Sequence, residues 1–195
     1  MKKLLLALLL SASLPAMAVS LSASSLNGNT FTDYSADGLL ALDINAYNSQ
    51  KISFNLNFNA AEIASGWVDF NAVVNNFLAG GIPALRFDFG FAPITPGTAN
   101  SAFNAGASGV FTTSQDGSTY VVRNLAVPFE HFGVLIGNPY GDAGKIDWQI
   151  NTAALSADTD YAFSVQAVPE PASLALLCAG LGLLGVTARR RRTMK

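Results

Sequence analysis

Two pairs of closely spaced carboxylates are the first candidates for chemistry in this sequence. Asp158 and Asp160 flank Thr159, and Asp142 lies shortly before Asp147. Paired carboxylates can bind calcium through their oxygens or hydrolyse glycosides as an acid and a base. Neither pair falls in a recognisable calcium loop, so solvated turns are the simpler interpretation. Of the two functional alternatives we favour calcium, because a domain without disulfides can use a bound ion as a cross-link.

His131 is the only histidine, and it is the only candidate base for a nucleophilic triad. No serine lies in a Gly-x-Ser-x-Gly sequence, which is the usual context of such a nucleophile. A zinc site built on several histidines is excluded by the count. We therefore expect His131 to be structural or exposed, and we predict no catalytic residue, no metal ligand and no enzymatic activity.

Aromatic side chains suggest a different kind of site. Trp67, Trp148, Tyr47 and Tyr140 could form a platform on which sugar rings stack, with amide side chains nearby. Trp148, however, alternates with Ile146 and with Ile150, a pattern typical of a core residue. A carbohydrate-binding, lectin-like role is therefore kept as an alternative.

These residues lie in a region whose hydrophobic pattern predicts β-strands. Apolar and polar residues alternate strictly over 52–59 and over 85–91, as expected when one face of a strand is buried and the other is wet. We predict further strands over 39–46, 109–113, 119–127, 133–136, 145–150 and 160–168. Asp116-Gly117 between two of them predicts a hairpin. The fold class predicted for residues 19–167 is an all-β, antiparallel sandwich or jelly roll.

One segment is ambiguous. Phe70, Val73, Val74 and Phe77 recur at helical spacing, whereas residues 67–74 fit a strand equally well. The sequence pattern alone is compatible with either a helix or a strand over this segment.

The charge of residues 19–168 limits the partners of this domain. The region holds twelve acidic and four basic side chains, a net charge of −8, and fifteen asparagines. It has no basic stripe, so we predict no nucleic-acid partner. It also has no cysteine, so its stability must come from packing without disulfides.

Residues 1–18 are predicted to be a secretory signal peptide. Lys2 and Lys3 precede a short apolar run, and Ala16 and Ala18 provide the small residues that signal peptidase accepts. The run is shorter than the roughly 20 residues of a membrane span. Cleavage after Ala18 would make Val19 the new N-terminus.

A second apolar stretch, residues 172–188, is predicted to be a transmembrane helix. Arg189, Arg190, Arg191 and Arg192 follow it directly and are expected to stop transfer, leaving residues 189–195 as a cytoplasmic tail. The chain between the two apolar stretches is therefore expected to be exported.

Val168, Pro169, Glu170 and Pro171 stand immediately before this stretch. A Pro-Glu-Pro triplet, an apolar helix and a run of arginines, in this order, resemble the PEP-CTERM sorting signal of exopolysaccharide-producing Gram-negative bacteria. The resemblance covers residues 168–195. It implies an exosortase, a membrane-embedded cysteine protease, as the partner that processes the chain near the triplet, and a precursor held in the membrane until then.

The resemblance concerns the tail and leaves the role of the outer domain open. We expect a structural or adhesive protein of the cell surface or the biofilm matrix, with exopolysaccharide as a further partner. A lectin-like module is the first alternative. A secreted hydrolase, which needs two carboxylates converging in a cleft, is the second.

Overall fold

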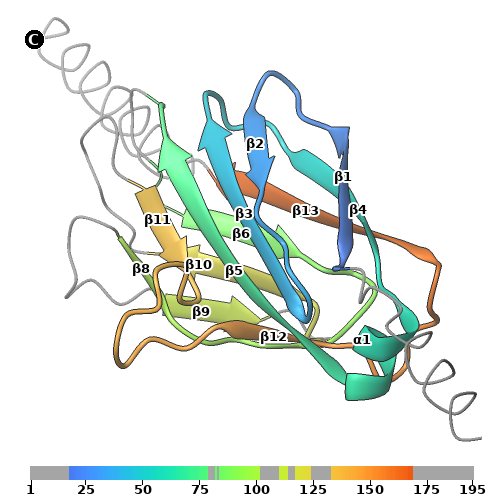
Figure 1. The fold of residues 1–195 in the computed structure, drawn as a ribbon. Coiled ribbons are helices and arrows are strands. Elements are labelled where there is room, and N and C mark those ends of the chain that lie inside the picture. Colours follow the sequence, from blue (N-terminus) through green and yellow to red (C-terminus); the bar gives the residue numbers. More distant parts are fainter. Residues whose placement is uncertain are drawn as a thin grey trace, which may run out of the picture.

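The computed structural model describes residues 18–78, 82, 84–101, 110–113, 117–123 and 133–168. In this part of the chain two β-sheets face each other, and one short helix lies beside them (Figure 1). The predicted all-β sandwich is confirmed. The strands of one sheet are antiparallel, and those of the other are mixed.

The six-stranded sheet has the order β1-β4-β13-β6-β10-β9. Its strands are β1 (Ser20–Ser25), β4 (Ile52–Asn57), β13 (Asp160–Val168), β6 (Ala84–Asp88), β10 (Thr119–Arg123) and β9 (Val110–Thr113). Strands β1 and β13 both pair with β4, and both begin opposite Asn57. The start of β1 therefore lies at the end of this sheet opposite to Val168, the last residue of β13.

The seven-stranded sheet has the order β2-β3-β5-β11-β8, with β12 and β7 attached to it through β5. Its strands are β2 (Thr30–Asp33), β3 (Leu39–Ala46), β5 (Trp67–Asn76), β11 (Gly133–Ile136), β8 (Ala99–Ser101), β12 (Trp148–Asn151) and β7 (Ile94–Thr95). The long strand β5 is parallel to β3 along one edge. Its other edge is shared by β11 and β12.

Aromatic rings from both sheets fill the space between them. Phe70 of β5 lies at the centre, with ring centroids 5.2 Å from Phe89, 6.0 Å from Phe87 and 6.2 Å from Phe163. Trp148 is fully buried against Phe70 and Phe87, so its prediction as a core residue is confirmed. Edge-to-face and stacked rings add to the hydrophobic stabilisation that burial provides.

The strands over 39–46 and 160–168 have their predicted bounds, and β9 and β10 form the predicted antiparallel pair around Gly117. The strand predicted from Lys145 begins only at Trp148, because residues 145–147 belong to a hydrogen-bonded loop. The helical alternative over Phe70–Phe77 is wrong. Both faces of β5 are largely buried, so its apolar residues do not alternate and the strand pattern is obscured.

Several elements were not predicted: the strands β1, β2, β7 and β8 and the helix α1 (Ala60–Ser65). Strands β1 and β2 lie at sheet edges and are mostly exposed, so no apolar alternation marks them, and β7 and β8 are too short to show a pattern. The helix has a local signal, an Asn59 N-cap with Glu62 at the third helical position, and the structure forms the capping box that this spacing permits.

Among the described residues, no helix is long and apolar enough to cross a membrane. The predicted span over 172–188 and most of the predicted signal peptide lie outside the described residues.

Phe70 is the residue on which the core depends most. Replacing it with alanine removes four ring contacts and leaves a cavity, so we expect Phe70→Ala to lower the free energy of unfolding by about 3–5 kcal/mol. Trp67, more than half exposed, is the control, and Trp67→Ala should change stability by no more than about 0.5 kcal/mol. Denaturant unfolding measures both, and similar losses in the two variants would contradict the central place given to Phe70.

Candidate functional site

A loop stands on the outer face of the seven-stranded sheet, at the point where β11 and β12 meet along β5. Strand β11 pairs with β5 as far as Ala72, and β12 resumes the pairing at Phe70. Asn71 thus has no partner strand on that edge. The intervening chain, residues 137–147, leaves the sheet there, and we call it the 137–147 loop.

Gly137 is the residue at which this loop leaves β11. It has a φ of +69°, and a Cβ there would lie 2.8 Å from the Phe70 carbonyl oxygen and 2.7 Å from Asp147 Oδ1. Only glycine fits so close to the neighbouring strand while also adopting this left-handed conformation.

Hydrogen bonds fix the loop internally. Asp147 Oδ1 accepts from Asn71 Nδ2 at 3.2 Å and from the Asn138 backbone N–H at 2.5 Å. The Asn138 side chain accepts from the Asp142 N–H at 2.7 Å and donates to the Lys145 carbonyl at 3.3 Å. Lys145 Nζ also pairs with Asp142 at 2.5 Å. The two aspartates predicted as a possible functional pair therefore have separate structural roles. Asp142 pairs with Lys145, whereas Asp147 accepts hydrogen bonds from Asn71 and Asn138.

The loop and the sheet enclose a pocket of about 400 Å³. Its walls combine apolar, aromatic and polar side chains: Tyr34, Leu39, Ala41, Leu42, Asp43, Asn71, Val73, Pro139 and Tyr140. Tyr140 belongs to the 137–147 loop, and Tyr34 directly follows β2, where its backbone N–H donates to the Ala41 carbonyl at 2.8 Å. The two tyrosines are 60% and 66% exposed, for Tyr34 and Tyr140 respectively, so their rings are available to a ligand.

Asp43 is the charged group of this pocket. It lies on β3 between Thr32 of β2 and Val73 of β5, and it is half-buried. Burial raises the pKa of the Asp43 carboxyl, and no hydrogen bond from a described residue offsets that effect. Asp43 is the sole carboxylate among the described residues that line the pocket. Asn71, which also lines the pocket, is buried and donates a hydrogen bond to Asp147.

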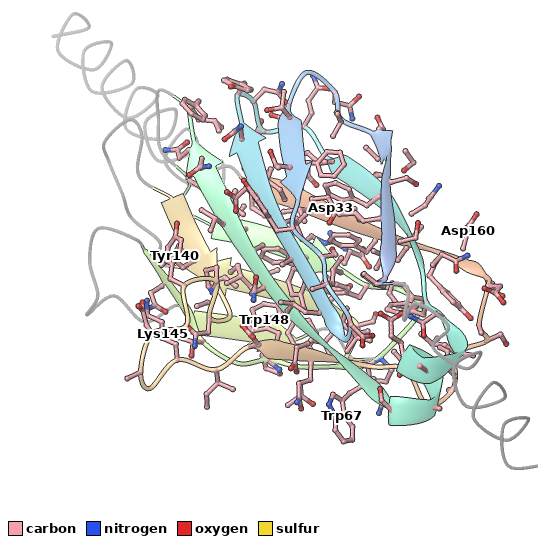
Figure 2. All side chains as sticks on the ribbon, in the orientation of Figure 1. Asp33, Trp67, Tyr140, Lys145, Trp148 and Asp160 are labelled. Carbon is pink, nitrogen blue, oxygen red and sulfur yellow. The ribbon has the colours of Figure 1, made fainter. Side chains whose placement is uncertain are left out.

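The four aromatic residues considered for a sugar platform do not come together. Trp148 lies between the sheets, while Trp67 projects from the start of β5 near α1, far from Tyr140 (Figure 2). Tyr47 stacks on Phe77, with ring centroids 4.8 Å apart. Of the four, only Tyr140 lines the pocket. Its companion Tyr34 was missed, because it follows a strand that the sequence pattern did not reveal.

The remaining candidates do not form a site in the described part of the chain. Asp160 accepts a hydrogen bond from Asn57 at 3.3 Å, and Asp158 occupies a turn with a φ of +56°. No cluster of three or more His, Cys, Asp or Glu side chains that could hold a metal occurs among the described residues. His131 lies outside them.

The C-terminal strand leads directly to the predicted sorting triplet. Strand β13 remains paired with β6 to its last residue, with Ala167 opposite Leu85 and Val168 opposite Ala84. A family model described as the PEP-CTERM protein-sorting motif matches residues 167–192. The chain carries a PEP-CTERM sorting domain. No curated protein and no solved structure is significantly similar to this PEP-CTERM protein.

The motif marks an exported protein that an exosortase processes. In this PEP-CTERM protein the matched segment begins inside the folded domain, since Ala167 is buried and hydrogen-bonded strand pairing continues to Val168. Pro169, Glu170, Pro171 and the arginines 189–192 lie outside the described residues, as does Ala16 of the predicted signal peptidase site. The assignment of those residues to cleavage and to stop-transfer stays a prediction.

The raised pKa of Asp43 has a consequence for stability. The Asp43 carboxyl stays protonated to a higher pH in the folded protein than in the unfolded chain, where its pKa is near 3.8. The contribution of Asp43 to stability therefore falls as the pH rises from that value through the raised pKa. We expect Asp43→Asn to remove this decline, so that the variant gains stability relative to the parent at neutral pH.

Urea unfolding between pH 3.5 and 7 measures the effect. Asp158→Asn, in an exposed turn, controls for the loss of one negative charge. A parent and an Asp43→Asn variant with parallel pH profiles would contradict the desolvation of this carboxyl.

Proposed function

We propose that the exported domain is an adhesive module that binds polysaccharide and has no catalytic activity, and that it attaches the protein to the extracellular polymer of its own cell. The observation that carries this proposal is the pocket between Tyr34 and Tyr140. Its volume of about 400 Å³ is typical of sites for small ligands, which are concave and combine apolar walls with a few polar groups.

Tyrosine suits this role for two reasons. It offers a large rigid surface, and ordering it on binding loses little conformational entropy because few torsions are involved. A sugar ring presents C–H groups on one face, and these can pack on an aromatic ring while the phenol oxygen keeps its contact with water. Hydrogen bonds fix the backbone on both sides of Tyr140, which favours binding further because the loop that carries the ring need not be ordered by the ligand.

The polar groups of the pocket favour a neutral polymer. The Asp43 carboxylate accepts no hydrogen bond from the described residues, so its oxygens are available to sugar hydroxyls. The same negative charge, together with the net charge of −8 for residues 19–168, repels polymers rich in uronic acids or sulfate. A neutral polysaccharide therefore fits better than an acidic one.

Binding is favoured over hydrolysis by the count of carboxylates. Glycosidases of the common type need two, separated by roughly 5–9.5 Å. Asp43 is alone among the described residues of the pocket, and the other acids of the neighbouring 137–147 loop are engaged in hydrogen bonds and an ion pair.

Removing either tyrosine should weaken binding. We expect Tyr34→Ala and Tyr140→Ala each to reduce affinity about tenfold or more, as aromatic anchors at the centre of an interface do. Tyr47→Ala is the matched control, because Tyr47 is also half exposed but lies against Phe77. Affinity electrophoresis in gels containing the exopolysaccharide of the producing cell, dextran or alginate measures binding to the cell's own, a neutral and an acidic polymer. Equal retardation of all four proteins would refute the assignment of the pocket.

For sorting, we propose that residues 172–188 hold the precursor in the membrane and that residues 169–171 are read by the exosortase. The two prolines remove two backbone donors and restrict φ, so this segment can extend neither β13 nor a following helix. We therefore expect an extended segment directly after the folded domain, accessible to a membrane protease.

Replacing Pro169, Glu170 and Pro171 with alanine should leave uncut precursor in the membrane fraction. The measurement is intact mass and fractionation in hosts with and without the exosortase. Tyr47→Ala serves as a folded control that should be processed normally. Normal processing of the triple variant would show that the enzyme does not read this triplet.

A further inference from the structure

Glu62 is a charged residue in a buried position, only 2% exposed. It lies at the third position of α1, where it closes the capping box: Glu62 Oε2 accepts from the Asn59 backbone N–H at 3.0 Å. In return the Asn59 side chain accepts from the backbone N–H of Glu62 at 3.0 Å. A capping box needs only one oxygen of the carboxylate.

The other oxygen of this carboxylate has no hydrogen-bond partner. Glu62 Oε1 is buried and unpaired among the described residues. Burial raises the pKa of Glu62, and the nearby Asp37 raises it further. The backbone N–H groups of Gly38 and Val19 lie close enough to the carboxylate to lower its pKa, but Oε1 accepts no hydrogen bond from them. A buried carboxylate without a cation is unfavourable, and such groups are normally paired.

The strand register explains why Val19 lies there. Ser20 pairs with Asn57, two residues before the N-cap Asn59, so the residue before β1 is brought to the start of α1. Val19 is itself 3% exposed and belongs to the hydrophobic core. Its backbone nitrogen therefore has a fixed position beside the carboxylate of Glu62.

Val19 is also the residue that the predicted signal peptide precedes. In the uncut chain its nitrogen is a neutral amide. Cleavage after Ala18 hydrolyses the Ala18–Val19 peptide bond with one water molecule, leaving a carboxylate on Ala18 and an α-amine on Val19. That amine is protonated at neutral pH, because its ordinary pKa is about 7.7–8.0.

We propose that Glu62 is a binding site for the α-ammonium group of Val19, formed when signal peptidase removes residues 1–18. The new positive charge lies beside the Glu62 carboxylate, so cleavage supplies the cation that this buried group lacks. The ion pair fixes Val19, the residue before β1, to α1 and makes the processed domain more stable than its precursor. This proposal is independent of the pocket and of its ligand.

The chemical reactivity of the α-amine tests the ion pair directly. Acylating reagents attack only the neutral amine, and a neighbouring carboxylate reduces the neutral fraction because it raises the pKa of the amine. In the processed protein exported by its host, we expect the Val19 amine to react with an acetylating ester at neutral pH about tenfold more slowly than in Glu62→Gln, or slower still. Glutamine can still close the capping box, which makes the variant a matched control.

A second variant moves the charge without touching Glu62. Inserting Gly-Ser between Ala18 and Val19 places the processed terminus two residues upstream, so that Val19 again contributes a neutral amide. We expect its new α-amine to react at the rate of an exposed one. Glu62→Gln should then lower the unfolding midpoint of the processed parent but leave unchanged or raise that of the insertion variant, where the carboxylate has no cation.

The two outcomes are distinct. Slow acetylation confined to the parent, together with a loss of stability on Glu62→Gln that occurs in the parent and not in the insertion variant, supports the site. Equal acetylation rates in the parent and the insertion variant would overturn it, and this comparison holds even if Glu62→Gln does not fold. N-terminal sequencing that finds a first residue other than Val19 would overturn it as well.

Discussion

The pairing of β5 with two different strands along one edge is the constraint on which the functional geometry depends. Because β11 and β12 share that edge, the connecting chain must leave the sheet beside Asn71, where neither strand reaches. Its exit passes so close to β5 that Gly137 cannot carry a side chain. The loop is then bonded back to the sheet through Asp147, which holds Tyr140 over β3 and β5. The pocket is thus a direct product of how the sheet is paired.

Much of the fold could be predicted from the sequence wherever one strand face is buried and the other is wet. Strands β3, β4 and β13 show that alternation, and their predicted positions agree with the structure. The pattern failed in two opposite situations. Strand β5 is buried on both faces because a loop covers its outer side, and β1 and β2 are exposed edge strands. In both cases alternation disappears, since burial no longer differs between the two faces.

The site was harder to predict, because it depends on tertiary contacts. Spacing suggested that Asp142 and Asp147 act together, yet a rigid loop uses one for an ion pair and the other as a hydrogen-bond acceptor. Tyr34 and Tyr140 are far apart in sequence, and only the parallel pairing of β3 with β5 and the exit of the 137–147 loop bring them to one pocket. The sorting motif, in contrast, is a local sequence signal and could be recognised without any structure.

The positions of the two ends of the six-stranded sheet also bear on how the protein is held during export. Strands β1 and β13 flank β4, and their first residues, Ser20 and Asp160, both lie opposite Asn57. Ser20 and Val168 are therefore separated by nearly the full length of β13, about 30 Å at roughly 3.4 Å per residue. If the precursor is held at the bilayer by both ends, as the proposed sorting scheme requires, β1 and β13 would run roughly parallel to the membrane plane. In the sorting scheme proposed above, removal of the signal peptide would leave one attachment, next to Val168, about which the domain would be free to rotate.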